Sequence, residues 1–188
     1  MPRGMEAKLG HQDILTYEEF LRVVRAAASE GMTKVRVTGG EPLVRKGLLD
    51  FISGMSVIPG LMDLRLTTNG VLLADMAGDL LAAGIRRVNI SLDSLRPEIF
   101  ASVTGRDEFE RVWQGIHAAL DAGFDRAKLN MVPLRGINDD ELMDFALLTR
   151  DLPIEVRFIE FMPLGRAEFW SPEQMVTVPE IKERLAPL

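Results

Sequence analysis

Residues 87–93 read Arg87-Val88-Asn89-Ile90-Ser91-Leu92-Asp93, with a polar side chain at every second position and an apolar one between. Because side chains alternate across a strand, this stretch predicts one polar and one apolar face. Parallel strands that are buried on both faces usually read as unbroken apolar runs, so a charged face implies a wet pocket and a ligand. Three further stretches show the same alternation: Lys34/Arg36/Thr38, Arg65/Thr67/Asn69 and Lys128/Asn130.

A glycine followed by an apolar residue and a short polar link precedes three of these strands, at Gly31, Gly84 and Gly123. Glycine just past a helix end is the usual left-handed cap, so helices and strands are expected to alternate. We expect helices near 17–30, 46–54, 72–83, 108–122, 139–150 and 178–185, and strands near 34–38, 63–68, 87–92, 127–132 and 155–161. Capping boxes are expected at Thr16 with Glu19, Asp107 with Glu110 and Asn138 with Glu141.

Strands joined through helices require parallel crossovers, which leaves a doubly wound sheet or a β/α barrel. Helices cover both faces of a doubly wound sheet, so charges along one whole face favour the barrel. Five strands cannot complete eight, and the predicted fold class is α/β, a partial parallel (β/α) TIM-like barrel. We expect a single domain over residues 1–188, with a lead-in at 1–15, β/α repeats at 16–162, and a loop and C-terminal helix at 163–188.

Composition excludes several classes of protein. The formal net charge of −6 disfavours binding to nucleic acid, and no apolar run is long enough to span a membrane. No signal-like leader precedes the first helix, so a cytoplasmic location is expected. The chain has no cysteine, and His11 and His117 are its two histidines. No thiolate-ligated metal or cluster can be held by these residues alone, and no metal ligand is predicted.

The first strand is followed by Gly39-Gly40-Glu41, at the edge where β/α barrels gather their active sites. Paired glycines let a backbone approach a ligand closely, and Glu41 could accept hydrogen bonds from a bound ammonium. A glycine turn leading into a helix that starts at Pro42 explains the same residues equally well. Taken alone, this motif does not distinguish a ligand-binding loop from a structural turn.

Cations and hydroxyls on the polar face predict a phosphorylated sugar ligand. Arg36 and Lys128 would repel one another without an anion between them, and phosphate is the natural candidate. Thr67 and Ser91 offer hydroxyls that suit a ribose, although turn formation explains the Thr-Asn-Gly sequence alone. Met162 would by default be a core residue.

Several motifs together resemble the radical S-adenosylmethionine (SAM) enzymes, and within them the molybdenum cofactor biosynthesis protein A family, the GTP 3′,8-cyclases. The GGEP motif alone would indicate only the radical SAM superfamily, whereas TGGEPL together with TTNG, NISLDSL and RFIEFMPLG is far more specific. The matching stretches run from Ile14 to Gly165: KVRVTGGEPLVRKGL, LRLTTNGVLL, AAGIRRVNISLDSL, VTGRDEFERV, KLNMVPLRGIND and VRFIEFMPLG.

The resemblance implies roles for individual residues. Contacts with SAM would come from Gly40, Ser91 and Met162, with Glu41 near its amino group, and contacts with GTP from Arg36, Thr67 and Lys128. Family members cleave SAM reductively at a [4Fe-4S] cluster, and the deoxyadenosyl radical abstracts a ribose hydrogen from GTP. The ribose carbon then attacks the guanine ring.

The family also has an amino-terminal strand with a three-cysteine cluster motif and a later cysteine segment, and neither is present here. We therefore expect a fragment, truncated at the N-terminal strand, that lacks the cluster ligands and has no cyclase activity of its own. The edge from Lys34 to Thr38 would then be unpaired and open to self-association.

Two other functions stay open. A cluster-free nucleotide-binding module or inactive paralogue would retain the pocket without the chemistry. A phosphate-substrate barrel such as an aldolase, with Lys128 forming a Schiff base, is the least favoured.

Overall fold

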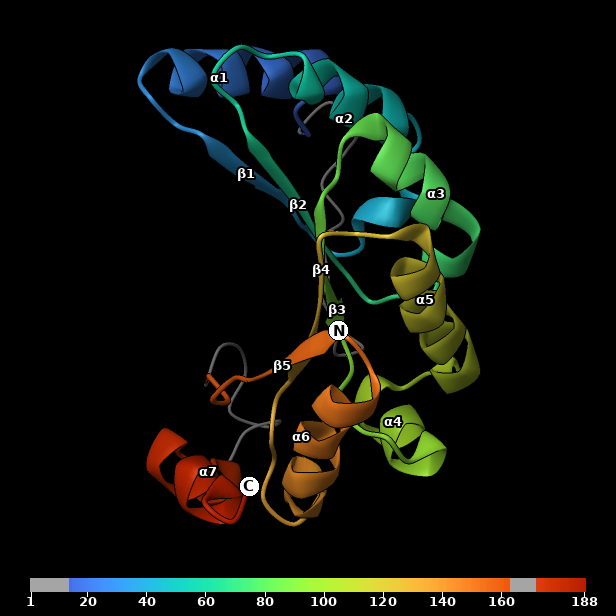
Figure 1. The fold of residues 1–188 in the computed structure, drawn as a ribbon, viewed down its shortest axis with the longest axis vertical. Coiled ribbons are helices and arrows are strands. Elements are labelled where there is room, and N and C mark those ends of the chain that lie inside the picture. The colour runs from blue at the N-terminus through green and yellow to red at the C-terminus, as the bar shows by residue number, and fades with distance from the viewer. Residues whose placement is uncertain (1–13, 163–171) are drawn as a thin grey trace.

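The computed structural model describes residues 14–162 and 172–188. Five parallel strands form one curved sheet in the order β1-β2-β3-β4-β5. Figure 1 shows helices α1, α2, α3, α5 and α6 along one side of this sheet. A doubly wound sheet would carry helices on both faces, so the partial barrel is confirmed. The strands are β1 (Lys34–Val37), β2 (Asp63–Thr68), β3 (Arg87–Ser91), β4 (Arg126–Met131) and β5 (Ile154–Phe158).

The helices lie close to their expected positions, with one addition. A short helix, α4, was not predicted; it begins at Pro97, whose fixed φ suits a first helical position, and it ends before the left-handed Gly105. The helices are α1 (Tyr17–Ser29), α2 (Leu48–Ser56), α3 (Leu73–Ala83), α4 (Pro97–Thr104), α5 (Phe109–Ala122), α6 (Leu142–Asp151) and α7 (Val178–Leu185), with 3₁₀ turns at Pro42–Val44, Asp139–Glu141 and Pro172–Gln174.

The apolar face of the sheet and the helices form the core. Leu66, Val88, Ile90 and Leu129 are all 0% exposed, because they alternate with the polar residues on their strands. Each such side chain contributes roughly 1.5–3 kcal/mol by leaving water. This packing fixes the strands and places their polar side chains on the face opposite helices α1, α2, α3, α5 and α6.

Helix α5 packs closely against the turn after β2 because two glycines meet there. A Cβ on Gly115 of α5 would lie 2.4 Å from the carbonyl oxygen of Gly70, in the turn after β2. Gly70 itself has a φ of +83°, a left-handed conformation that favours glycine. The turn that follows β2 is therefore held directly against α5.

One predicted capping box is confirmed and two are wrong. The Thr16 side chain caps α1, and Glu19 accepts a bond from the Thr16 backbone in return. The N-cap of α5 is Glu108, without a side-chain hydrogen bond, so Asp107 plays no such part. Asn138 likewise makes no side-chain cap, because tertiary partners take up its amide.

Both edges of the sheet are open among the described residues, since β1 pairs only with β2 and β5 only with β4. None of the described helices is both long and apolar enough to cross a membrane.

Candidate functional site

The register of the sheet places the predicted polar residues on one face. Thr67 of β2 is the Cα partner of Asn89, which is in turn the partner of Lys128 on β4. Arg36 of β1 is the Cα partner of Arg65 of β2. Arg65 is two residues before Thr67, so its side chain is on the same face as Thr67. Arg36 and Lys128 therefore share a face. Three rows result: Arg36, Arg65, Arg87 and Arg126; Thr67, Asn89, Lys128 and Glu155; Ser91, Asn130 and Arg157.

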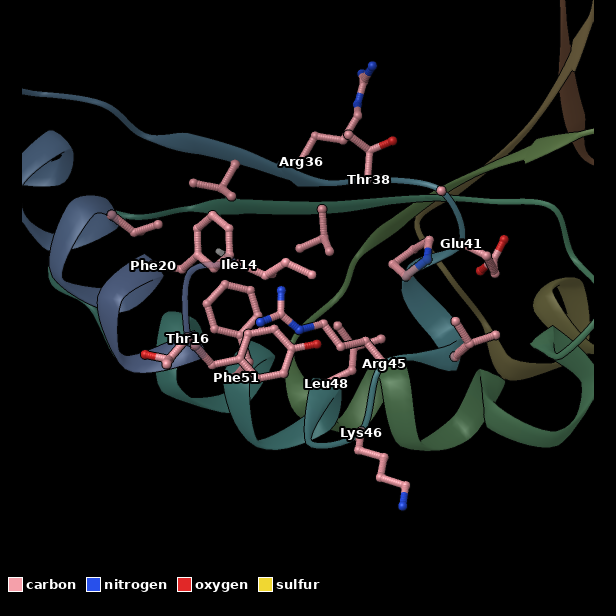
Figure 2. Close-up of a pocket in the computed structure, with 18 of the residues that line it drawn as sticks. Ile14, Thr16, Phe20, Arg36, Thr38, Glu41, Arg45, Lys46, Leu48 and Phe51 are labelled. Atoms are coloured by element: carbon pink, nitrogen blue, oxygen red, sulfur yellow. The ribbon is translucent and has the colours of Figure 1, made fainter. Parts of the chain in front are cut away.

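Arg36 projects from β1 away from the helices. Figure 2 shows its guanidinium on the opposite side of the strand from Phe20 and Phe51. Within residues 14–162 and 172–188, Arg36 has neither a hydrogen-bond nor an ion-pair partner. Its positive charge is therefore available to an anion on the open face.

Lys128 is paired with Glu155, a residue that the sequence analysis missed. The Lys128 ammonium donates to Glu155 Oε2, and Arg126 Nη1 lies 3.1 Å from Glu155 Oε1. The bond from Lys128 lowers the pKa of Glu155, and the charges of Arg126 and Arg157 lower it further. An ion-paired ammonium is not the neutral amine that a Schiff-base aldolase requires.

A second carboxylate neutralises the amino-terminal half of the face. Asp63 Oδ2 accepts from Arg65 Nε at 3.0 Å and from Arg87 Nη1 at 3.2 Å. The hydrogen bond from Arg65 is the main cause of the lowered pKa of Asp63. Like-charged side chains on neighbouring strands repel, so Asp63 stabilises this part of the arginine row.

Glu41 ties the carboxyl ends of β1 and β2 together. Its Oε1 accepts from Leu43 N at 3.1 Å and from Thr68 Oγ1 at 2.8 Å, and its Oε2 accepts from Asn69 N at 2.7 Å. A carboxylate has about four acceptor sites, so one remains for a ligand ammonium. Gly40, immediately before it, is exposed.

The ends of β3 and β4 are joined by buried polar groups. Asp93 Oδ1 accepts from Val132 N at 3.0 Å, and burial raises the pKa of this carboxyl. Asn138 Nδ2 donates to the carbonyls of Asp93 and Val132 at 2.6 and 3.0 Å. This network positions Ser91, two residues before Asp93, on the polar face.

Two amides on the polar face lack partners. Asn89 is 4% exposed and its Nδ2 is unpaired, as is Asn130 Oδ1, among the described residues. An unpaired buried polar group costs about 1–3 kcal/mol, so natural structures normally supply a partner. A hydrogen-bonding ligand or water on this face would supply it.

Met162 follows β5 and is 62% exposed, so its default assignment to the core is wrong. Strand β5 ends at Phe158, two residues before Glu160, whose parity along the sequence is opposite to that of Arg157. Arg157 lies opposite Asn130 and adds a further cation to the face.

An apolar groove of about 810 Å³ runs along the helix side of β1. Tyr17, Phe20 and Phe51 line it, with the Arg45 guanidinium 4.3 Å from the centre of the Tyr17 ring. Most of its lining is hydrophobic and lies on the helix side of β1, across the strand from the Arg36 guanidinium. Arg36, Gly40 and Glu41 also border the groove, so it adjoins the polar site at the carboxyl end of β1.

The described residues include no cluster of metal-ligand side chains. No group of three or more His, Cys, Asp or Glu side chains that could hold a metal ion occurs within residues 14–162 and 172–188. The whole chain lacks cysteine, so its residues do not fit an iron–sulfur cluster held by thiolates.

The polar face, the partial barrel and the motifs at its strand ends define a class of protein. Residues 2–149 match the family model of the radical SAM superfamily, and the chain belongs to that superfamily. Among curated proteins, the GTP 3′,8-cyclase of Geobacter sulfurreducens is 52% identical over 188 residues, which are 99% of this chain and 57% of that protein. The GTP 3′,8-cyclase of Heliobacterium modesticaldum is 48% identical over 186 residues, again 99% of this chain and 57% of that protein.

Solved structures agree on the fold. A methylornithine synthase aligns with a TM-score of 0.70 at 15% identity, covering 91% of this chain and 52% of that one. A radical SAM methyltransferase from Sphaerobacter thermophilus aligns with a TM-score of 0.69 at 18% identity, covering 90% and 53%. The chain thus spans little more than half of the curated relatives it matches.

Proposed function

We propose that the polar face binds GTP and SAM as part of a GTP 3′,8-cyclase of molybdenum cofactor biosynthesis. The observation that carries the proposal is the register that places Arg36, Thr67 and Lys128 in adjoining rows of one open face. The 52% identity to a GTP 3′,8-cyclase supports the choice of nucleotide. In this proposal the protein is cytoplasmic, and it binds neither nucleic acid nor a membrane.

Three residues of the face have roles in nucleotide binding in this proposal. Arg36 and Lys128 bind the phosphates, because a guanidinium or ammonium makes charge-assisted hydrogen bonds to phosphate oxygens. The Thr67 hydroxyl lies in the row of Lys128, where it bonds to the ribose. Asn89 lies between the two and is buried, and its amide nitrogen has no hydrogen-bond partner among the described residues.

SAM would lie at the carboxyl ends of the strands. Gly40 leaves room for close backbone contact, Ser91 donates from the polar face, and Met162 offers an exposed apolar surface. The remaining acceptor site of Glu41 takes the amino group. Bound SAM supplies one-electron chemistry only with a reducing centre, and this chain has no cysteine with which to hold a cluster.

Binding without turnover is therefore the expected behaviour of the purified chain. Isothermal titration should show saturable binding of GTP and of SAM, since the residues proposed for both ligands are present. Assays for the cyclised nucleotide, after attempted cluster reconstitution and with a chemical reductant, should give none. Turnover would contradict the proposed lack of a redox centre, and failure to bind either ligand would contradict the binding role. The alternative function, a cluster-free nucleotide-binding module, predicts the same binding of both ligands. It differs from the proposed function only because such a module has no cluster-bearing partner.

Self-association through the β1 edge remains a prediction. An antiparallel β1–β1 contact would bring Lys34 and Arg36 of the two copies close together, and salt would screen their repulsion. Light scattering should show a dimer fraction that rises with protein concentration and with salt. Lys34→Glu should increase dimerisation at low salt, whereas Lys182→Glu on exposed α7 should not. A monomer under all these conditions would rule out this contact.

A further inference from the structure

We propose that Glu155 is a positioning residue, an internal counter-ion that holds Lys128 and competes with the nucleotide phosphates for it. The inference rests on the proposed nucleotide binding and concerns how the free protein keeps its binding cation in place. In this scheme a phosphate displaces the carboxylate from Lys128 when the nucleotide binds.

The geometry gives each oxygen of Glu155 its own cation. Oε2 accepts from the Lys128 ammonium, and Oε1 lies 3.1 Å from Arg126 Nη1. Glu155 is the Cα partner of Lys128 across the β4–β5 pair, so both side chains leave the sheet on the same face. A ligand phosphate that reaches Lys128 from the open face therefore meets the Glu155 carboxylate.

Exposure distinguishes Glu155 from the other carboxylate of the face. The Glu155 side chain is 46% exposed, whereas Asp63, which bridges Arg65 and Arg87, is 13% exposed. A half-exposed carboxylate can turn into water with little desolvation change, and exposed ion pairs are individually weak. Asp63 therefore suits a permanent structural bridge, and Glu155 suits an exchangeable one.

Lys128 itself is largely enclosed, with a side chain 16% exposed. An enclosed ammonium needs a partner at all times, because an unpaired charge away from water is costly. Glu155 supplies that partner in the free protein, and a phosphate supplies it in the complex. The side-chain position of Lys128 is thus maintained in both states.

A purely structural role predicts a different result. If Glu155 served only to hold β4 and β5 together, removing its charge would weaken the protein and leave phosphate affinity equal or lower. If Glu155 competes with the ligand, removing its charge frees Lys128 and Arg126 and tightens binding. The direction of the change in affinity separates the two roles.

The test is isothermal titration of the chain with inorganic triphosphate and with GTP at fixed salt. Glu155→Gln keeps the size and polarity of the side chain, and we expect it to bind both probes roughly five-fold more tightly, as expected for release of one weak ion pair. Glu110→Gln on the outer helix α5 makes the same change in net charge far from the face, and its affinity should match the wild type. Carbon NMR of the Glu155 carboxyl should show a shift when triphosphate is added to the wild type.

The outcomes separate the inference from the function on which it rests. Triphosphate binding by the wild type with equal or weaker binding by Glu155→Gln would overturn the counter-ion role and leave nucleotide binding intact. Equal tightening by Glu110→Gln would also overturn it, because net charge alone would then explain the effect. No binding of either probe to any variant would overturn the proposed function itself, and the counter-ion role with it.

Discussion

Lys128→Met is expected to weaken GTP binding about 10- to 100-fold. The substitution keeps an unbranched side chain of similar length and removes the ammonium that we propose contacts the phosphates. A hydrogen bond to a charged group contributes about 1.5–3 kcal/mol, which corresponds to this range of affinity. The loss is increased because the Glu155 carboxylate would face the phosphates with Arg126 as its remaining ion-pair partner. Isothermal titration with GTP measures the effect.

Lys182→Met provides the matched control, because Lys182 is exposed on α7 and outside the polar face. Its GTP affinity should equal that of the wild type. A Lys128→Met variant that is folded by circular dichroism and binds GTP within about two-fold of the wild type would remove Lys128 from the site. Such a result would also remove the basis for the competition by Glu155.

The polar face could be predicted because two local rules combine. Alternation fixes which side chains of one strand share a face, and parallel pairing of successive strands carries that face across the sheet. Arg36, Thr67 and Lys128 follow from these rules without knowledge of the register, and the register agrees with them. Their roles as ligand contacts remain predictions, because the polar face by itself does not identify its ligand.

The sequence did not predict that Glu155 is part of the polar face, although its position along the last strand was a local signal for it. Glu155 and Arg157 have the same parity on the last strand. That strand begins one residue earlier and ends three residues sooner than expected, so the predicted strand included Glu160, whose parity is opposite. The pairing of Glu155 with Lys128 depends on the β4–β5 register, a tertiary property that no local pattern gives.

The wrongly predicted helix caps also show that a local sequence pattern does not reveal tertiary contacts. Asn138 and Glu141 have the spacing of a capping box, yet both make tertiary contacts instead. Glu141 is 3% exposed and accepts from Ser94 Oγ at 2.7 Å and from Leu95 N at 2.6 Å. Loops after β3 and β4 therefore use these side chains to hold the carboxyl ends of the two strands together, and local propensity gives way to that network.

Gly115→Ala is expected to lower the free energy of unfolding by about 2 kcal/mol. Its Cβ would lie 2.4 Å from the carbonyl oxygen of Gly70 and 3.2 Å from Leu73 Cβ, and a backbone oxygen cannot rotate away. Overpacking of this kind costs about 3 kcal/mol, and the better helix propensity of alanine offsets about 1 kcal/mol of it. Urea denaturation monitored by circular dichroism measures the difference.

Gly78→Ala is the matched control, because Gly78 lies in α3 and an added Cβ there would have no neighbouring atom within 4 Å. That change should stabilise the protein by about 0.5–1 kcal/mol through helix propensity alone. If Gly115→Ala were as stable as Gly78→Ala, the close approach of α5 to the β2 turn would be wrong. Because Asn69 N in that turn donates to Glu41, a displaced turn should also weaken SAM binding, and titration of the two variants with SAM tests this link between the outer helix and the site.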